Sequence, residues 1–86
     1  MKVHQKQDEQ RLIAKPIDTS WEQADARLKR AGVSVWSLIG YLRAFGGDNE
    51  RVREAFALSP QELAAALAYY RHNEASVDAR LLLNSA

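Results

Sequence analysis

The stretch from Val33 to Arg71 constrains the fold of this chain more than any other part of it. Apolar residues recur there at the spacing of one helix face, and two short turns interrupt the pattern. The first turn contains Gly46 and Gly47, and the second leads into Ser59 and Pro60, a pair typical of a helix start. The stretch therefore predicts three helices, and its short second turn has the spacing of a helix-turn-helix unit.

Capping residues predict where these helices begin. Ser34 is the expected N-cap of the first helix, and Asp48 or Asn49 is the expected N-cap of the second. The third helix is expected to start with a capping box, in which Ser59 and Glu62 satisfy each other's backbone amides. All three starts therefore rest on polar side chains that can accept a hydrogen bond from the first helical turn.

A fourth helical segment is expected over about residues 74–83, after a break at His72 and Asn73. The helices share one apolar face, which should form a single contiguous core. The predicted core residues are Leu38, Ile39, Leu42, Phe56, Leu63 and Leu67.

The segments before Val33 have a weaker pattern. Residues 1–18 are mostly polar and charged, with one short apolar patch at Leu12 and Ile13 and with Pro16, and we interpret them as a polar N-terminal arm: a frayed tail with a short strand around Arg11 to Ile17. Residues 19–32 fit a helix that Gly32 would stop, or a hairpin, and both alternatives stay open. We therefore divide the chain into the arm, 1–18, and a helix-turn-helix-like domain, 19–86, that ends in a partner-binding helical tail.

Composition narrows the function classes. The chain has 86 residues, no cysteine and a net charge of +1, which fits one small domain in a reducing cytoplasm. We expect no membrane span, because no apolar run approaches the ~20 residues that one needs. Neither of the two histidines, His4 and His72, has a second ligand at metal-binding spacing. Ser59 has no base nearby in the sequence, so we expect no enzymatic activity, no metal and no cofactor.

The sequence VSVWSLIGYLRAF, followed by ALSPQELAAALAYYRHNEASVDARL, resembles domain-of-unknown-function family 433. This is a group of small prokaryotic antitoxin-like proteins. The resemblance implies an all-α, homeodomain-like helix-turn-helix bundle, to which the N-terminal segment adds at most a short strand or hairpin. Residues 30–34 depart from the family's glycine-threonine-arginine order. The matching residues are Val35, Trp36, 38–42, 58–60, Leu63, 66–70, Val77 and Asp78.

Members of that family are commonly found beside genes for nuclease-like toxins of the PIN type. The resemblance therefore implies an antitoxin that binds and blocks its toxin with a terminal segment and represses its own operon by binding DNA. The alternative is a homodimeric protein-interaction domain with no nucleic-acid role. A dimer is expected in either case, because a domain this small often needs a partner to bury enough apolar surface.

The charge distribution sets where DNA contacts are expected. Residues 1–47 hold eight Lys or Arg against five Asp or Glu, whereas residues 48–72 hold three against four. Phosphate contacts should therefore come from the first half of the chain, and a solvated basic face is the alternative. The third helix offers one usual base-reading side chain near its start. The predicted DNA-binding residues are Arg27, Lys29, Arg30, Arg43 and Gln61.

The C-terminal tail predicts a protein contact. Three consecutive leucines cannot all face one side of a helix, so some should cover the core and some should meet another chain. Val77 and Leu81 can equally close the core over Tyr70, and core packing is the alternative role of Tyr69. The predicted partner-binding residues are Tyr69, Val77, Leu81, Leu82 and Leu83.

Overall fold

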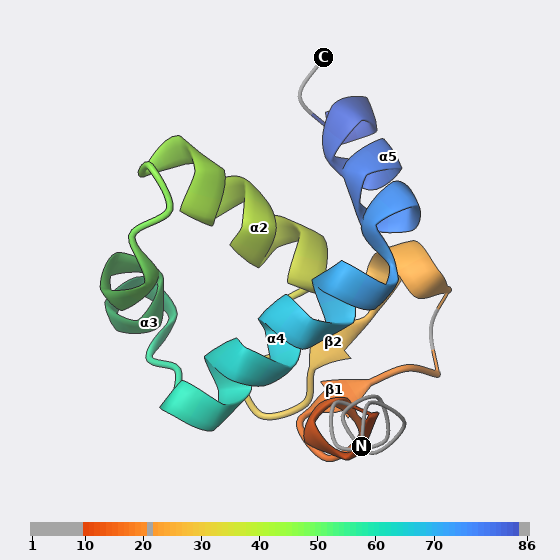
Figure 1. Cartoon of the computed structure of the whole chain (residues 1–86), viewed down its shortest axis with the longest axis horizontal. Helices are drawn as coiled ribbons and strands as arrows, with labels where there is room; N and C mark the ends of the chain where they lie inside the picture. The colour runs from red at the N-terminus through yellow and green to blue at the C-terminus, as the bar shows by residue number, and fades with distance from the viewer. Residues whose placement is uncertain (1–9, 21, 85–86) are drawn as a thin grey trace, which may run out of the picture.

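The computed structural model describes residues 10–20 and 22–84, which form a mostly helical fold with one small hairpin (Figure 1). Helix α4 crosses the centre of the molecule, and α5 leaves its end toward the C-terminus (Figure 1). Residues 10–14 are also helical. The elements that follow are β1 (Ile17–Asp18), η1 (Gln23–Asp25), β2 (Arg27–Leu28), α2 (Val35–Ala44), α3 (Asn49–Phe56), α4 (Pro60–His72) and α5 (Glu74–Asn84).

The predicted helix starts are confirmed. The side chains of Ser34 and Asp48 each accept a hydrogen bond from the backbone amide three residues further along the chain. In α4, the Glu62 amide donates to the Ser59 hydroxyl over 3.1 Å, and the Ser59 amide donates to the Glu62 carboxylate over 2.9 Å. The break at Asn73 is confirmed as well, since this residue caps α4 just before α5 begins.

Glycine is required in the turn between α2 and α3. Gly46 and Gly47 have φ angles of +69° and +83°, which lie in the left-handed region that other residues rarely adopt. The Gly47 amide donates back to the carbonyl of Leu42 over 2.8 Å and so closes the end of α2. Because the turn is this tight, α3 folds back within a few residues of the end of α2.

Residues 19–32 form a 3₁₀ turn and one arm of a hairpin, so the hairpin alternative is right and the helix alternative is wrong. Ile17 pairs with Leu28 in the antiparallel ladder of β1 and β2, and the Lys29 amide donates to the Pro16 carbonyl over 2.8 Å. The chain then reverses at Gly32, whose φ is +67°. Burial of Leu28 in the core outweighs the local helical spacing. Trp21 lies outside the described residues.

Residues 10–18 do not form a separate arm, which corrects the predicted division of the chain. Ile13 and Ile17 are both buried in the core, although residues 1–18 as a whole are mostly polar and charged. Of the strand expected around residues 11–17, only Ile17 is in a strand, and residues 10–14 are helical instead. Two buried isoleucines are enough to fix this segment, because each contributes about 1.5–3 kcal/mol of hydrophobic stabilisation.

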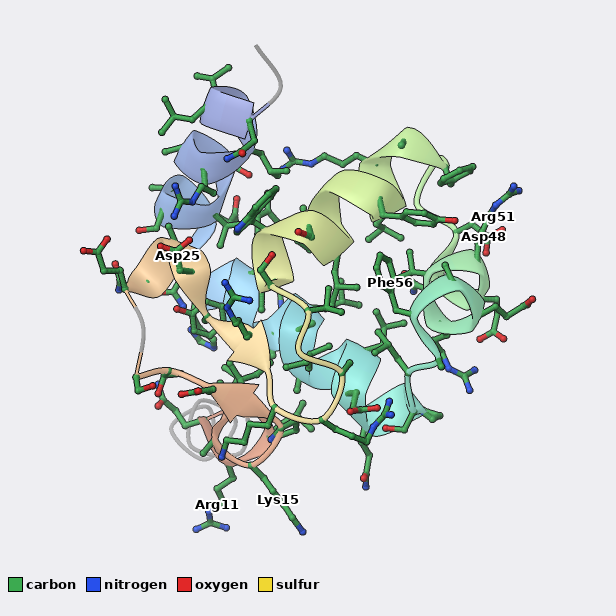
Figure 2. All side chains as sticks on the ribbon, turned by 180° about the vertical axis from the view of Figure 1, so that it is seen from behind. Arg11, Lys15, Asp25, Asp48, Arg51 and Phe56 are labelled. Carbon is green, nitrogen blue, oxygen red and sulfur yellow. The ribbon has the colours of Figure 1, made fainter. Side chains whose placement is uncertain are left out.

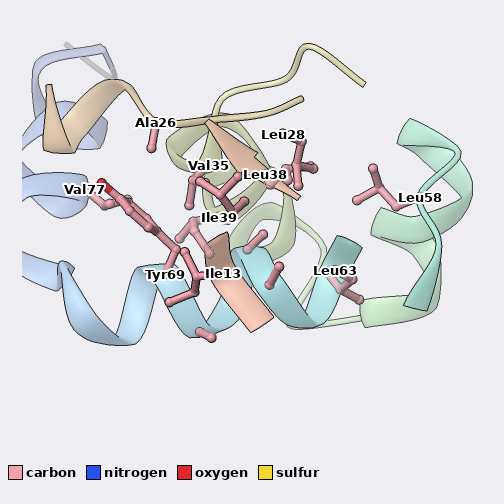
Figure 3. Packing of buried hydrophobic residues seen from close by; sticks show 14 of the residues in the cluster. Ile13, Ala26, Leu28, Val35, Leu38, Ile39, Leu58, Leu63, Tyr69 and Val77 are labelled. Carbon is pink, nitrogen blue, oxygen red and sulfur yellow. The ribbon is translucent and has the colours of Figure 1, made fainter. Parts of the chain in front are cut away.

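The core predicted from the helices is present, and residues before α2 enlarge it. Leu38, Ile39 and Leu63 are fully or almost fully buried (Figure 3), whereas Leu42, Phe56 and Leu67 are half-buried at its edge. Its most deeply buried large side chains come from the hairpin, α2, α3 and α5. The core residues are Ile13, Ile17, Ala26, Leu28, Val35, Leu38, Ile39, Val52, Leu58, Leu63, Ala65, Ala66, Ala68, Tyr69 and Val77.

Candidate protein-interaction surface

Helix α4 is too deeply buried to act as a DNA-recognition helix along its length. Its fully exposed residues lie only at its two ends, at Pro60 and Gln61 and at Arg71 and His72. A recognition helix must present a continuous side to the major groove. The side expected to be open was the one opposite the apolar stripe of the sequence, but residues before α2 contact it: Arg30 pairs with Glu62, and the Tyr69 hydroxyl donates to the Gln23 carbonyl. Residues of that side that are buried instead are Glu62, Ala65, Ala68 and Tyr69.

Arg30, a predicted DNA contact, is engaged within the chain. Its guanidinium donates to both carboxylate oxygens of Glu62, over 2.8 and 2.7 Å, and to the Ala57 carbonyl over 2.6 Å. This bidentate pair connects the turn after β2 to the start of α4. The hydrogen bond from Arg30 is the main reason that the pKa of Glu62 lies below its ordinary value, and the Ser59 amide also contributes. Arg30 thus holds the Glu62 carboxylate in place within the capping box.

The stability of the fold should fall in acid, in part through Glu62. A carboxyl group whose pKa is lower in the folded than in the unfolded chain stabilises the fold at neutral pH, and this contribution is lost as the pH falls below about 4.5. The urea midpoint of Glu62→Gln should therefore be lower at pH 7 and should fall less steeply than that of the wild type toward about pH 3. Parallel curves for the two proteins would contradict a role for this carboxylate.

Arg43 is also engaged, and it lies apart from the other predicted DNA contacts. From the last turn of α2 it donates to Asp78 of α5 over 2.7 Å and to the hydroxyl of Tyr70 on α4. The Tyr70 hydroxyl in turn donates to Asp78 over 2.8 Å. Hydrogen bonds from both Arg43 and Tyr70 lower the pKa of Asp78. This network ties three helices together and leaves Arg43 little freedom to contact a phosphate.

Two solvent-exposed cations, Arg11 and Lys15, lie close together but were not among the predicted DNA-binding residues. Arg11 and Lys15 lie four residues apart and point away from the body of the molecule (Figure 2). They line a surface hollow of about 190 Å³ with Gln61, which joins the N-terminal residues to the start of α4. Lys29 reaches the same segment, where its ammonium donates to the Ala14 carbonyl over 3.3 Å. Arg27 is exposed on β2.

The spacing of Arg11 and Lys15 was a signal available in the sequence. Two like charges one helical turn apart repel each other and weaken a helix slightly. No hydrogen bond or ion pair holds either side chain among the described residues. We call Arg11, Lys15, Lys29 and Gln61 the basic surface.

Two of the predicted partner-binding residues lie inside the chain's own core. Val77 is 0% exposed, and Tyr69 is buried with its hydroxyl donating to the Gln23 carbonyl over 2.7 Å. These positions correct the assignment of both residues to a partner-facing surface. Val77 lies on α5, which packs against η1 and α2, whereas Tyr69 connects α4 to η1 through its hydroxyl.

The three leucines of α5 divide between the core and the solvent. Leu81 is half-buried against the core, and its Cδ2 atom lies so close to Gly40 that a Cβ there would approach within 2.9 Å. Leu82 and Leu83 are 74% and 73% exposed, as expected for leucines that cannot reach the same side of the helix. They are therefore the strongest candidates for contact with another chain.

A hollow and an ion pair adjoin these leucines. Leu83 lines a surface hollow of about 210 Å³ between α5 and η1. On its wall, Arg80 forms an ion pair with Asp25, and this pair anchors α5 to η1. The residues around the hollow are Glu22, Ala24, Ser76, Ala79, Arg80 and Leu83.

Within 10–20 and 22–84, no group of three or more potential ligands could hold a metal ion. No helix in that part of the chain is both long and apolar enough to cross a bilayer. Comparison with protein-family models, curated proteins and solved structures found no match to this chain.

Proposed function

We propose that this chain is the antitoxin-like component of a prokaryotic toxin–antitoxin pair, which sequesters a nuclease-like toxin of the PIN type in the cytoplasm. The observation that carries the proposal is the exposure of Leu82 and Leu83, adjacent leucines on a helix that is otherwise anchored to the core. Large apolar side chains exposed together on a small protein typically mark an interface. The resemblance to family 433 supplies the class of the toxin.

The way α5 is held supports this role. Val77 fixes its inner side to the core, while ion pairs from Arg43 to Asp78 and from Arg80 to Asp25 hold it on two flanks. A helix that is already ordered loses less conformational entropy on binding than a disordered tail does. The leucines are thus presented on a fixed support, and the proposed activity is binding without catalysis.

Replacing both exposed leucines tests the proposal. The double variant Leu82→Asp/Leu83→Asp should bind the product of the neighbouring gene at least about 100-fold more weakly than the wild type, because two anchors are lost. Ala55→Asp, which adds a charge at an exposed alanine of α3, is the control and should bind normally. Titration calorimetry measures both affinities.

Two results would contradict the proposal. Wild-type affinity in the double variant would show that α5 is not the toxin contact. If the neighbouring gene encodes no nuclease-like protein, the toxin–antitoxin assignment is wrong. The alternative is then a homodimeric protein-interaction domain.

The second part of the proposal is repression of the chain's own operon. The order of α2, α3 and α4, with only residues 57–59 between the last two helices, supports a homeodomain-like arrangement. Since the length of α4 is covered, we place the DNA contact on the basic surface rather than along that helix. Its Arg and Lys side chains would contact phosphates, and Gln61 would be its base-reading side chain.

Salt dependence tests this location. Binding of the chain to its promoter should weaken steeply with salt, and Arg11→Ala or Lys15→Ala should each reduce the slope of log K against log salt by about one unit. Arg51→Ala is the control, because Arg51 lies over the ring of Phe45, near the α2–α3 turn. No binding at low salt, or equal slopes for all four proteins, would contradict a DNA-binding role of this surface.

A further inference from the structure

The hollow of about 190 Å³ at the basic surface is lined by two kinds of side chain. Arg11 and Lys15 are exposed and point away from the body of the molecule (Figure 2). Leu12 and Pro16, each one residue further along the chain, are half-buried, and Leu12 packs against the core. The hollow therefore has cations at its rim and an apolar inner wall that the fold holds in place.

Gln61 adds a neutral amide to this hollow. It is exposed in the first turn of α4, and no hydrogen bond within the described residues holds its side chain. A side-chain amide can donate and accept hydrogen bonds at the same time. None of the described residues that line the hollow is acidic, and the neighbouring Glu62 is buried and paired with Arg30. A negatively charged ligand therefore meets no repelling charge in the lining.

This set of groups matches the major groove of double-stranded DNA at an A·T pair. Glutamine can form two hydrogen bonds with the edge of adenine, and apolar side chains contact the methyl group of thymine. Guanine is usually bound by Arg or Lys, and cytosine by a carboxylate. Here the two cations at the rim point outward, and no carboxylate lines the hollow. Among the four bases, the lining therefore suits adenine and thymine.

We propose that the hollow recognises neighbouring A·T pairs in the major groove of DNA. The Gln61 amide nitrogen donates to adenine N7, and its oxygen accepts from the N6 amino group, while Leu12 and Pro16 contact a thymine methyl group. Arg11 and Lys15 contact phosphates and give affinity without base preference. This recognition rests on the proposed DNA-binding role of the basic surface, and it adds the bases that the surface distinguishes.

The first test changes the DNA and leaves the protein intact. Fluorescence anisotropy at about 50 mM salt compares binding of the full chain to short duplexes of alternating A·T, A·U or G·C pairs. Replacing thymine with uracil removes only the methyl group and should raise the Kd about fourfold, the value of one buried carbon group. The G·C duplex should bind at least about fivefold more weakly than the A·T duplex. Equal Kd values for the A·T and A·U duplexes overturn the proposal.

Replacing Gln61 tests the adenine contact. Gln61→Ala should raise the Kd for the A·T duplex at least about fivefold and bring it close to the Kd for the G·C duplex. Asn49→Ala is the matched control, because it removes an exposed amide from the first turn of α3, and it should leave every Kd unchanged. Both side chains are exposed, so both variants should melt like the wild type. A Gln61→Ala variant that keeps the full preference for A·T is evidence against the contact.

Replacing Leu12 tests the apolar wall. Leu12→Ala should bind the A·T and A·U duplexes with the same Kd, whereas Gln61→Ala should still distinguish them. An undiminished difference in folded Leu12→Ala contradicts the assignment of the methyl group to this wall. Since Leu12 is half-buried, thermal unfolding first establishes that its variant is folded. If it is not, the comparison of A·T with A·U on the wild type decides the matter by itself.

Salt dependence separates base recognition from DNA binding. Arg11→Ala should weaken binding to all three duplexes by the same factor, because phosphates are common to them. Binding that falls steeply with salt, but with equal Kd values for the three duplexes, would show phosphate contact without base recognition. The present proposal would then fail while the DNA-binding role stands. No binding to any duplex at low salt would remove both.

Discussion

Replacing Ile17 with alanine is expected to lower the free energy of unfolding by about 2–5 kcal/mol. The side chain is only 2% exposed, and its strand partner Leu28 is completely buried, so the substitution leaves a cavity beside the hairpin. Urea unfolding followed by circular dichroism measures the effect. A small domain has a total stability near the low end of the usual ~5–15 kcal/mol, so much of the sample should be close to unfolding.

Lys15→Ala is the matched control for this experiment. It truncates a neighbouring side chain that points into solvent, and it should change the free energy of unfolding by less than about 0.5 kcal/mol (Figure 2). If Ile17→Ala were as mild as Lys15→Ala, residues 10–18 would behave as the detached arm that the composition of the segment suggests.

Replacing Val77 with aspartate is expected to cost more than about 3 kcal/mol, because it places an unpaired charge at a position that is 0% exposed. The helix α5 should then leave the core, and its amides should exchange rapidly with solvent. Leu82→Asp is the control, five residues along the same helix and 74% exposed, and should change stability by less than about 0.5 kcal/mol.

Both α5 variants are best compared by thermal unfolding and hydrogen exchange under the same conditions. Similar losses of stability for Val77→Asp and Leu82→Asp would mean that α5 is covered on both sides. No loss for either would mean that α5 does not close the core.

Local chemistry made the helices predictable. Ser34, Asp48 and the Ser59–Glu62 capping box act on amides within three residues of themselves, so the rest of the fold need not be known to place them. The same holds for the break at Asn73. For the leucines of α5, the 100° step between helical residues already excluded that all three face the core.

The candidate surfaces were less predictable, because they depend on which elements pack together. Arginine is a residue type that often contacts DNA phosphates, which is why Arg30 and Arg43 were predicted as DNA contacts. Their actual partners, Glu62 and Asp78, lie 32 and 35 residues further along the chain. Nothing in the sequence around either arginine marks those pairings. In contrast, the spacing of Arg11 and Lys15 was visible in the sequence, although their meeting with Gln61 was not.

The sequence by itself determined the four helices from Ser34 to Asn84 and the residues at which they start. It also determined that at least one of the three leucines of α5 is exposed. Only the tertiary structure decided that Ile13, Ile17 and Leu28 share one core with the helices, and that Tyr69 and Val77 are internal. The physical reason is the range of the forces. Caps and helical periodicity depend on residues within about one turn of each other. Burial depends on segments that are far apart in the chain, and the favoured packing is the one that removes most apolar surface from water.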